Sequence, residues 1–415
     1  SQYFSKTFKL ASYFNIMLIG IVAKPSAGKS TFFKAATLAE VEIAPHPFTT
    51  IKSQEGVAFV KIPCADKDFN KKCNPKYGYC INSNRFVPIK LMDVPGLIEN
   101  AHLGEGLGLE FLNDIREADA LIHIIDISGS TDEKGNQVQA LSHDPLKDVK
   151  FLEKELDYWY LSILKKAWEK FVKTLKTENL NIKQALAKQL SALKVTEEIV
   201  EHAIKKLKLL HHPDQWDEQD LMNLATELRK ATKPMIIAAN KIDIQGSQIY
   251  LDKLKEEFPE YKIIPCSADS EIALREASKH KLINYIPGEN NFTIIDEDKL
   301  TLNQLKALHY IKENVLEKYN STGVQDILNY AVFDLLKYIS VFPVENQHLT
   351  DSSGKNVLPD CFLMPPNSTA LDFAFKLHTD IGNTFVKAIN VRTKQAIGKE
   401  YRLKNLDVIE IKTSK

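Results

Sequence analysis

The sequence predicts an α/β protein: a mostly parallel β-sheet with helices on both faces, an α-helical hairpin inserted into it, and a β-grasp module at the C-terminus. Three observations support this fold class. Short apolar segments alternate with helical ones, a long middle stretch has helical spacing without a strand pattern, and prolines and glycines separate short strands near the end. Because 415 residues exceed what one hydrophobic core usually serves, we expect several domains.

Six segments have the composition of buried parallel strands, since they are short, apolar and partly β-branched. They comprise residues 17–22, 56–62, 87–92, 118–126, 234–239 and 262–266. Helical patterns lie between most of them, and three more helices, around residues 270–281, 301–319 and 322–337, are expected after the last strand. Helices that connect parallel strands in this way cover both faces of the sheet.

The sheet domain is expected to be interrupted between its fourth and fifth strands. Apolar residues recur there at helical spacing, and Thr196 followed by two glutamates is typical of a helix start. From about Val341, short strands surround one helix in the order β-β-α-β-β, which is typical of a β-grasp module. The predicted divisions are 1–16, a leader or tag ahead of Met17; 17–149 and 227–337, the two parts of the sheet domain; 150–226, the helical insertion; and 338–415, the β-grasp domain.

Composition excludes several classes of protein. The 54 Lys and Arg residues balance the 54 Asp and Glu residues, so net charge gives no reason to expect nucleic acid or a membrane surface as partner. No apolar run is long enough to span a bilayer. The odd number of cysteines, five, indicates reduced thiols rather than a disulfide scaffold. We therefore expect a cytoplasmic protein without a membrane partner.

A phosphate-binding loop is predicted between the first strand and the helix after it. Backbone N–H groups of such a loop cradle the α- and β-phosphates of a nucleotide, aided by the helix N-terminus. Lys29 would reach the β- and γ-phosphates, Ser30 would bind Mg²⁺, and Thr31 could touch the α-phosphate. The loop departs mildly from the usual pattern because an alanine replaces its first glycine. The nucleotide-binding residues predicted here are Lys24, Pro25, Ser26, Ala27, Gly28, Lys29, Ser30 and Thr31, preceded by Ala23.

Two further motifs would complete a magnesium site. Asp93 ends the third strand, where a carboxylate can hold Mg²⁺ through water, and the Gly96 N–H can meet the γ-phosphate. Thr50, or else Thr49, lies in a proline-rich loop and could complete the magnesium shell that Ser30 and Asp93 begin. The Asp93 motif alone also fits an ordinary turn, but behind a phosphate loop it becomes specific. The Thr50 segment also fits a proline-rich loop that enters a strand.

The base-binding residues are predicted after the fifth and sixth strands. Asp243 can accept hydrogen bonds from the ring N–H and the exocyclic amine of guanine, whereas adenine presents an acceptor there. Asn240 would fix the loop, and the Lys241 stem can lie along the base. Ser267 and Ala268 would supply a backbone N–H to the guanine carbonyl. Four elements in this order, each after a strand, predict GTP and GDP as ligands, with hydrolysis at the γ-phosphate.

These motifs together resemble the Obg-related, YchF-type family of P-loop GTPases and ATPases. The runs Pro-Phe-Thr-Thr at 47–50, Asp-Val-Pro-Gly-Leu at 93–97 and Gly-Glu-Gly-Leu-Gly at 104–108 resemble its switches, and the C-terminal module resembles a TGS domain. The resemblance covers residues 17–415 and is of the archaeal type. Relatives with an altered base-reading motif often prefer ATP; Asn240 and Asp243 favour GTP here, with an ATP-preferring ATPase as the alternative.

The resemblance also implies how hydrolysis would proceed. Leu97 stands where related GTPases carry the glutamine that orients water, and the family pattern suggests His102 in a water-positioning role. Phosphoryl transfer depends mainly on positioning and on charge neutralisation, here by Lys29 and Mg²⁺. We expect slow turnover that a partner or K⁺ accelerates. Potassium-dependent relatives carry asparagine where this chain has Ser26, which weakens the potassium alternative.

The predicted insertion is rich in lysine, and the resemblance to a ribosome-associated family implies RNA or a ribosome as its partner. The only acidic residues among these lysines in the sequence are Glu169 and Glu178. The lysines are Lys165, Lys166, Lys170, Lys173, Lys176, Lys183, Lys188 and Lys194. A solvated helix face is the alternative, and the TGS-like module could share the binding surface or contact protein. A protein that binds nucleotide as a gate, with negligible hydrolysis, remains the competing functional class because Leu97 permits it. Oligomeric state stays open.

Three cysteines fall within one lysine-rich loop: Cys64, Cys73 and Cys80. They could bind zinc with a fourth ligand such as His46. The loop lacks the Cys-x-x-Cys pair that is typical of zinc sites, so unligated thiols are the first expectation.

Overall fold

The computed structural model describes residues 17–38, 52, 54–96, 108–166, 168, 171–174, 181–209, 212–345, 348–351 and 353–414. The chain forms two compact units. The central unit comprises Leu18–Phe33 and Met92–Asp269, and the terminal unit comprises Ser1–Met17, Lys34–Leu91 and Ser270–Lys415. Within the described ranges, no helix is both long and apolar enough to cross a membrane.

The central unit is built on parallel strands in the order β1 (Leu18–Val22), β5 (Ala120–Asp126), β6 (Met235–Asn240) and β7 (Ile263–Pro265). Every residue of β1, β5 and β6 is buried, as expected for parallel strands covered on both faces. The helices α3 (Gly108–Glu117) and α9 (Gln248–Glu257) contact β1 and β7, respectively. The register places Asp126 beside Asn240, so the polar ends of β5 and β6 meet at one edge of the sheet.

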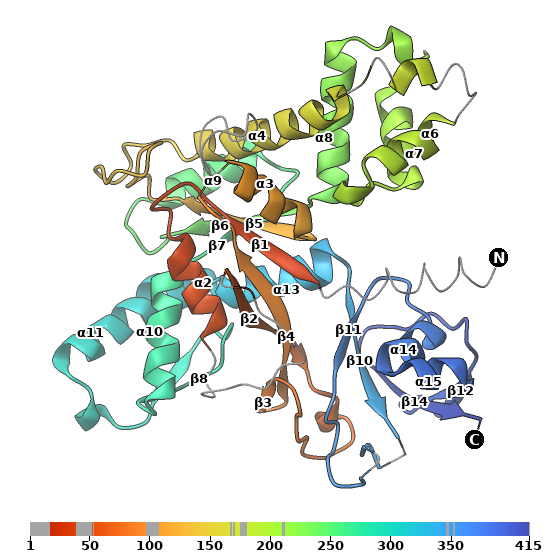
Figure 1. Ribbon diagram of the computed structural model, residues 1–415. Helices are drawn as coiled ribbons and strands as arrows, with labels where there is room; N and C mark the ends of the chain where they lie inside the picture. The colour runs from red at the N-terminus through yellow and green to blue at the C-terminus, as the bar shows by residue number, and fades with distance from the viewer. Residues whose placement is uncertain are drawn as a thin grey trace. The chain divides into compact units, whose positions relative to one another are not determined.

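The helical insertion lies between β5 and β6 and consists of α4 (Leu146–Lys165), α6 (Ile182–Gln189), α7 (Glu197–Leu207) and α8 (Glu218–Thr232). Thr196 caps α7 as predicted, and Asp217 forms a capping box on α8. Figure 1 shows α4 and α8 side by side. Arg229 of α8, 1% exposed, joins them by donating from Nε to Asp157 of α4 at 2.8 Å. The predicted hairpin is therefore the α4–α8 pair, with α6 and α7 between them in the described part of the chain.

The terminal unit contains β2 (Glu55–Pro63), β3 (Tyr79–Ile81) and most of β4 (Asn84–Asp93), with β4 beside both β2 and β3. Its helices are α10 (Ala268–Lys279), which begins in the central unit, α11 (Leu302–Ile311), α12 (Glu317–Tyr319) and α13 (Val324–Asn329), with π-helical turns at Lys312–Leu316 and Tyr330–Leu335. The antiparallel pair β8 (Ile283–Tyr285) and β9 (Phe292–Ile294) was not predicted. Three-residue strands such as β3, β8 and β9 carry too little periodicity to be recognised in a sequence.

The C-terminal module is a five-stranded sheet in the order β11-β10-β14-β12-β13. Its elements are β10 (Ile339–Val344), β11 (Phe362–Met364), α14 (Ala370–Leu377), α15 (Thr379–Asn383), β12 (Phe385–Asn390), β13 (Gln395–Ile397) and β14 (Asp407–Thr413). The first and last strands, β10 and β14, are parallel, while the other pairs are antiparallel. Buried Val341, Phe373 and Ile409 form its core. The β-grasp expectation is confirmed, with α15 and β13 added to the predicted order.

Candidate nucleotide-binding site

The predicted phosphate loop turns directly from β1 into α2 (Lys29–Thr37). Ser26 has a φ of 62° and Gly28 a φ of 96°, so the turn passes twice through the left-handed region of backbone conformation. The Phe32 N–H donates to the Gly28 carbonyl at 2.9 Å, which closes the first turn of α2. The N–H groups at the start of a helix have no partner within that helix, and this is the arrangement that binds phosphate.

One buried side chain ties this loop to the two predicted base-binding segments. Asn240, at the end of β6 and 2% exposed, donates from Nδ2 to the Ala27 carbonyl at 3.1 Å. Its Oδ1 accepts from the Ala268 N–H, also at 3.1 Å. A Cβ at Gly28 would lie 2.2 Å from Asn240 Nδ2, so glycine is required for this close approach. The prediction that Asn240 fixes the loop therefore has a definite geometry: one amide joins all three segments.

The Ala268 contact changes one part of the predicted site. Its backbone N–H was expected to be available for a guanine carbonyl, but it donates to Asn240 instead. Ala268 thus connects the segment after β7 to the end of β6. Ser267 is buried, whereas Asp243 is half-buried at the end of the β6 loop.

Lys241 reaches from the end of β6 to the phosphate loop. Its Nζ donates to the Ser26 carbonyl at 3.2 Å and forms an ion pair with Asp126 at 2.9 Å. The extended stem that sequence reasoning expected along a base is thus anchored at its charged end.

Asp126 is the residue that the sequence reasoning missed. Its carboxylate is fully buried and accepts from the Ser128 N–H at 3.1 Å, Ser130 Oγ at 2.9 Å and Thr131 Oγ1 at 2.8 Å, besides Lys241. Burial by itself would raise the pKa of Asp126, but the hydrogen bonds and the Lys241 charge outweigh it and lower that pKa. Its place at the carboxyl end of a buried parallel strand was the signal that could have revealed it.

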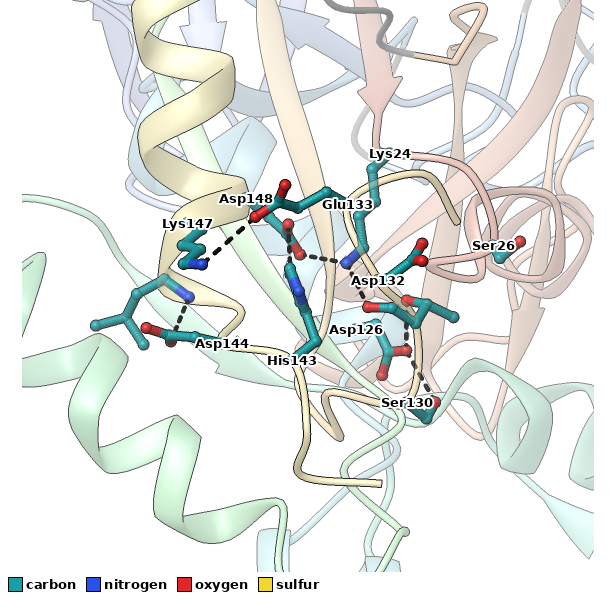
Figure 2. A network of polar contacts seen from close by, with 12 residues as sticks. Lys24, Ser26, Asp126, Ser130, Asp132, Glu133, His143, Asp144, Lys147 and Asp148 are labelled. Atoms are coloured by element: carbon teal, nitrogen blue, oxygen red, sulfur yellow. Dashed lines mark hydrogen bonds and ion pairs between the residues drawn. The ribbon is translucent and has the colours of Figure 1, made fainter. Parts of the chain in front are cut away.

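Lys24 is turned toward the loop that follows β5 rather than toward the phosphate loop's concave side (Figure 2). Its Nζ, in a side chain 4% exposed, forms an ion pair with Asp148 at 2.8 Å and donates to the Thr131 carbonyl at 2.8 Å. His143 contacts the other oxygen of the same carboxylate at 2.9 Å. Burial raises the pKa of Asp148 despite these partners. The predicted phosphate contact of Lys24 is therefore restricted to its backbone N–H.

The same loop packs against the tip of the phosphate loop. Gly135 has a φ of 83°, and a Cβ on it would lie 2.6 Å from Pro25 Cβ. Gly96 also lies near this proline, since its own Cβ would stand 3.9 Å from Pro25 Cγ. Two segments of the central unit thus come close to Pro25, which is itself exposed.

The residues predicted to act on the γ-phosphate and Mg²⁺ lie next to one another. Lys29 Nζ forms an ion pair with Asp93 Oδ1, and the Val94 N–H donates to the Ile21 carbonyl at 3.2 Å, which holds the end of β4 against β1 within the central unit. Ser30 is exposed at the start of α2. A hydroxyl and a carboxylate are the oxygen ligands that Mg²⁺ prefers, so this donor set fits the ion. Thr49, Thr50, Leu97 and His102 lie outside the described residues.

Comparisons with known proteins identify the family of this chain. Residues 18–154 match a family model described as 50S ribosome-binding GTPase, residues 238–346 match the G4 motif-containing domain of the YGR210-like Obg-like GTPases, and residues 354–413 match the TGS domain. The chain is 45% identical to a GTP-binding protein of Methanocaldococcus jannaschii over 95% of this chain and 98% of that protein.

Two further relatives cover nearly the whole chain. The crystal structure of a GTP-binding protein from Pyrococcus horikoshii is 39% identical, with a TM-score of 0.75, and covers 96% of this chain and 100% of that one. The ribosome-binding ATPase YchF of Buchnera aphidicola is 27% identical over 89% of this chain and 86% of its own. The chain belongs to the Obg-like, YchF-type family of P-loop GTP-binding proteins.

Proposed function

We propose that this protein binds GTP with Mg²⁺ and hydrolyses its γ-phosphate slowly. The observation that carries the proposal is the Asn240 amide, which joins the phosphate loop to both base-binding segments. The phosphate loop and the two base-binding segments are thereby held together as one site, which can bind both the phosphates and the base of a nucleotide.

The preference for GTP over ATP rests on Asp243. Its carboxylate accepts two N–H groups from guanine, whereas adenine would place an acceptor against it. Lys241, held at its tip by Asp126, keeps its stem beside the base. A site built to pair with specific N–H groups rejects an analogue that lacks them strongly, because its own polar groups are left unpaired.

Turnover depends on how the chain rearranges its own charges. Ser30, Asp93 and Thr50 would hold Mg²⁺, which would supply charge neutralisation for the phosphates. Lys29 exchanges its Asp93 partner for phosphate oxygens, which releases that carboxylate toward the water shell of the metal. Leu97 cannot orient a water molecule, and His102 is the proposed substitute. We expect unaided turnover at or below about 10⁻⁴ per second, the range of small GTPases that do have the glutamine.

A coupling to the ribosome or to RNA is the second part of the proposal. It is supported by the ribosome-binding name of the Buchnera relative and by the basic insertion. Ion pairs reduce the number of lysines that are available to a phosphate on this surface. Lys165 pairs with Glu218, Lys183 with Glu201 and Lys194 with Asp119. Acidic residues from neighbouring segments thus neutralise part of the predicted patch. Lys166 and Lys188 are exposed and remain candidates for phosphate contacts.

The decisive experiment compares GTP, ATP and XTP on the wild-type protein and on Asp243→Asn. We expect GTP to bind at least about 100-fold more tightly than ATP in the wild type. Asp243→Asn should prefer XTP, because an amide N–H can donate to the second ring carbonyl of xanthine. Asp252→Asn, a change at an exposed aspartate of α9, is the matched control. A wild-type preference for ATP would refute the base assignment.

Single-turnover hydrolysis, measured with and without ribosomes, tests the catalytic part. Lys29→Ala should abolish turnover, and unchanged rates in His102→Ala would remove this histidine from the mechanism. If turnover stays negligible even with ribosomes present, the protein is a nucleotide-gated binding module rather than an enzyme.

A further inference from the structure

Three cysteines of the terminal unit meet at one point, although they lie in different parts of the chain. Cys64 directly follows β2, Cys80 lies in the middle of β3, and Cys73 lies in the irregular segment between them. Their sulfurs and one carboxylate oxygen of Asp66 all lie within 4.8 Å of one another. Cys64 and Asp66 are buried, and the other two cysteines are half-buried.

We propose that Cys64, Cys73, Cys80 and Asp66 form a structural zinc site. A tetrahedral Zn²⁺ ion binds sulfur at about 2.3 Å and carboxylate oxygen at about 2.0–2.2 Å, which sets its ligand atoms roughly 3.5–3.8 Å apart. The four ligand atoms lie within 4.8 Å of one another, so a shift of at most about 1 Å brings them to this spacing. A multi-iron cluster would spread its ligands over two or more irons, so at least some of the ligand atoms would have to lie farther apart. Four protein ligands leave no open position, so the site is structural rather than catalytic.

Asp66 supplies an independent sign of a missing partner. Its Oδ2 accepts from the Cys73 N–H at 3.4 Å, while its Oδ1 is buried without a hydrogen-bond partner among the described residues. A carboxylate oxygen buried in this way costs free energy unless something binds it. A metal ion satisfies it, and the hydrogen bond from Cys73 then orients the ligand, as bonds around metal ligands usually do.

A buried positive charge lies near the cluster: Arg85 is close enough to Cys73 to interact with it electrostatically. Arg85 is 1% exposed and donates to the Leu358 and Pro359 carbonyls at 3.0 and 2.8 Å, but it has no ion-pair partner within the described part of the chain. Three thiolates and a carboxylate around Zn²⁺ carry a net charge of −2, which this buried guanidinium would partly balance.

The segment from 64 to 78 explains what the ion would stabilise. Seven of its fifteen residues are exposed, and its buried side chains are those of Cys64, Ala65 and Asp66, too few to form an apolar core. Nevertheless the segment holds the C-terminal module: the Asn74 and Lys76 N–H groups each donate at 2.8 Å, to the Val357 and Pro359 carbonyls. A metal that closes this segment takes the place of the missing core.

The test uses the full-length protein, reduced and freed of metal with a chelator. We expect the purified protein to carry one zinc ion per chain. The metal-free protein should take up one Co²⁺ ion with thiolate-to-cobalt charge-transfer absorption, and zinc should displace it. Absence of that absorption in the reduced wild type would overturn the proposal.

Variants identify the ligands. Cys73→Ser and Asp66→Asn should each weaken Co²⁺ binding at least about 100-fold, the upper end of what outer-shell changes cost. Cys361→Ser, outside the cluster, should leave the affinity unchanged. His46→Ala should also have no effect; if it weakens binding while Asp66→Asn does not, the assignment of Asp66 is wrong.

Limited trypsin digestion tests the structural role without variants that could misfold. The segment carries exposed Lys67, Lys71, Lys72 and Lys76. Removing zinc should speed cleavage after these lysines at least about tenfold, and adding zinc back should restore protection. Equal cleavage rates with and without zinc would overturn the structural role.

Discussion

Replacing Asn240 with alanine tests whether one amide holds the nucleotide site together. The change removes the partners of the Ala27 carbonyl and the Ala268 N–H, both of which belong to residues that are at most 1% exposed. A buried backbone group that loses its partner costs about 1–3 kcal/mol, so two of them cost about 2–6 kcal/mol. The folded site can avoid this cost only by letting water in or by letting the loops move apart.

Either response lowers the fraction of molecules whose loops are arranged for binding, and apparent affinity falls in proportion to that fraction. The lower bound of about 2 kcal/mol corresponds to a roughly 30-fold weaker GDP complex, at about 1.4 kcal/mol for each factor of ten. Fluorescence titration with a labelled GDP measures it, and thermal unfolding reports the accompanying loss of stability.

Asn223→Ala is the matched control, because this asparagine is exposed on α8 and alanine suits a helix. Its GDP affinity and Tm should stay at wild-type values. The reasoning fails if Asn240→Ala binds GDP within threefold of the wild type and unfolds at the same temperature.

Three further changes separate binding, stability and pH dependence. In Gly28→Ala the new side chain must adopt a φ near 96° and would clash with Asn240, so nucleotide affinity should fall at least about tenfold. The control Ala23→Gly, in the same loop, should bind nucleotide almost normally. Equal affinities of the two variants would contradict the close approach of Gly28 to Asn240. Lys24→Met leaves the buried Asp148 carboxylate without its cation and should destabilise the protein by about 3–5 kcal/mol, which thermal unfolding would show as a lower Tm. The control Lys147→Met removes an exposed ion pair and should leave the Tm unchanged. Asp126→Asn should lower the free energy of unfolding at neutral pH. Because the pKa of Asp126 is lowered in the folded protein, the difference in unfolding free energy between wild type and variant should have its full size above about pH 4 and should shrink as the pH falls below that. Urea titrations across this range measure the difference, and a constant value would refute the assignment.

Much of the fold was readable because it depends on local pattern. The six predicted strands correspond to β1, β2, β4, β5, β6 and β7, with ends that differ by at most three residues. Their apolar, β-branched composition reflects burial on both faces, which leaves a signal in any window of the sequence. The phosphate loop and the base-binding motif could be predicted from the sequence for the same reason, since each is a short run of residues that directly follows such a strand.

The sequence by itself determined which segments carry chemistry, because residue type and position after a strand are local properties. Only the tertiary structure decided which partner each side chain takes. In the structure, Lys24 forms an ion pair with Asp148, and Asp126 forms one with Lys241. The Ala268 N–H donates a hydrogen bond to Asn240. These pairings join residues far apart in the chain, and they depend on sheet register, which no short window of sequence specifies. The cysteines lie close together in the chain, and their spacing suggested unligated thiols, but it was the packing of β2, β3 and the segment between them that placed them around one point.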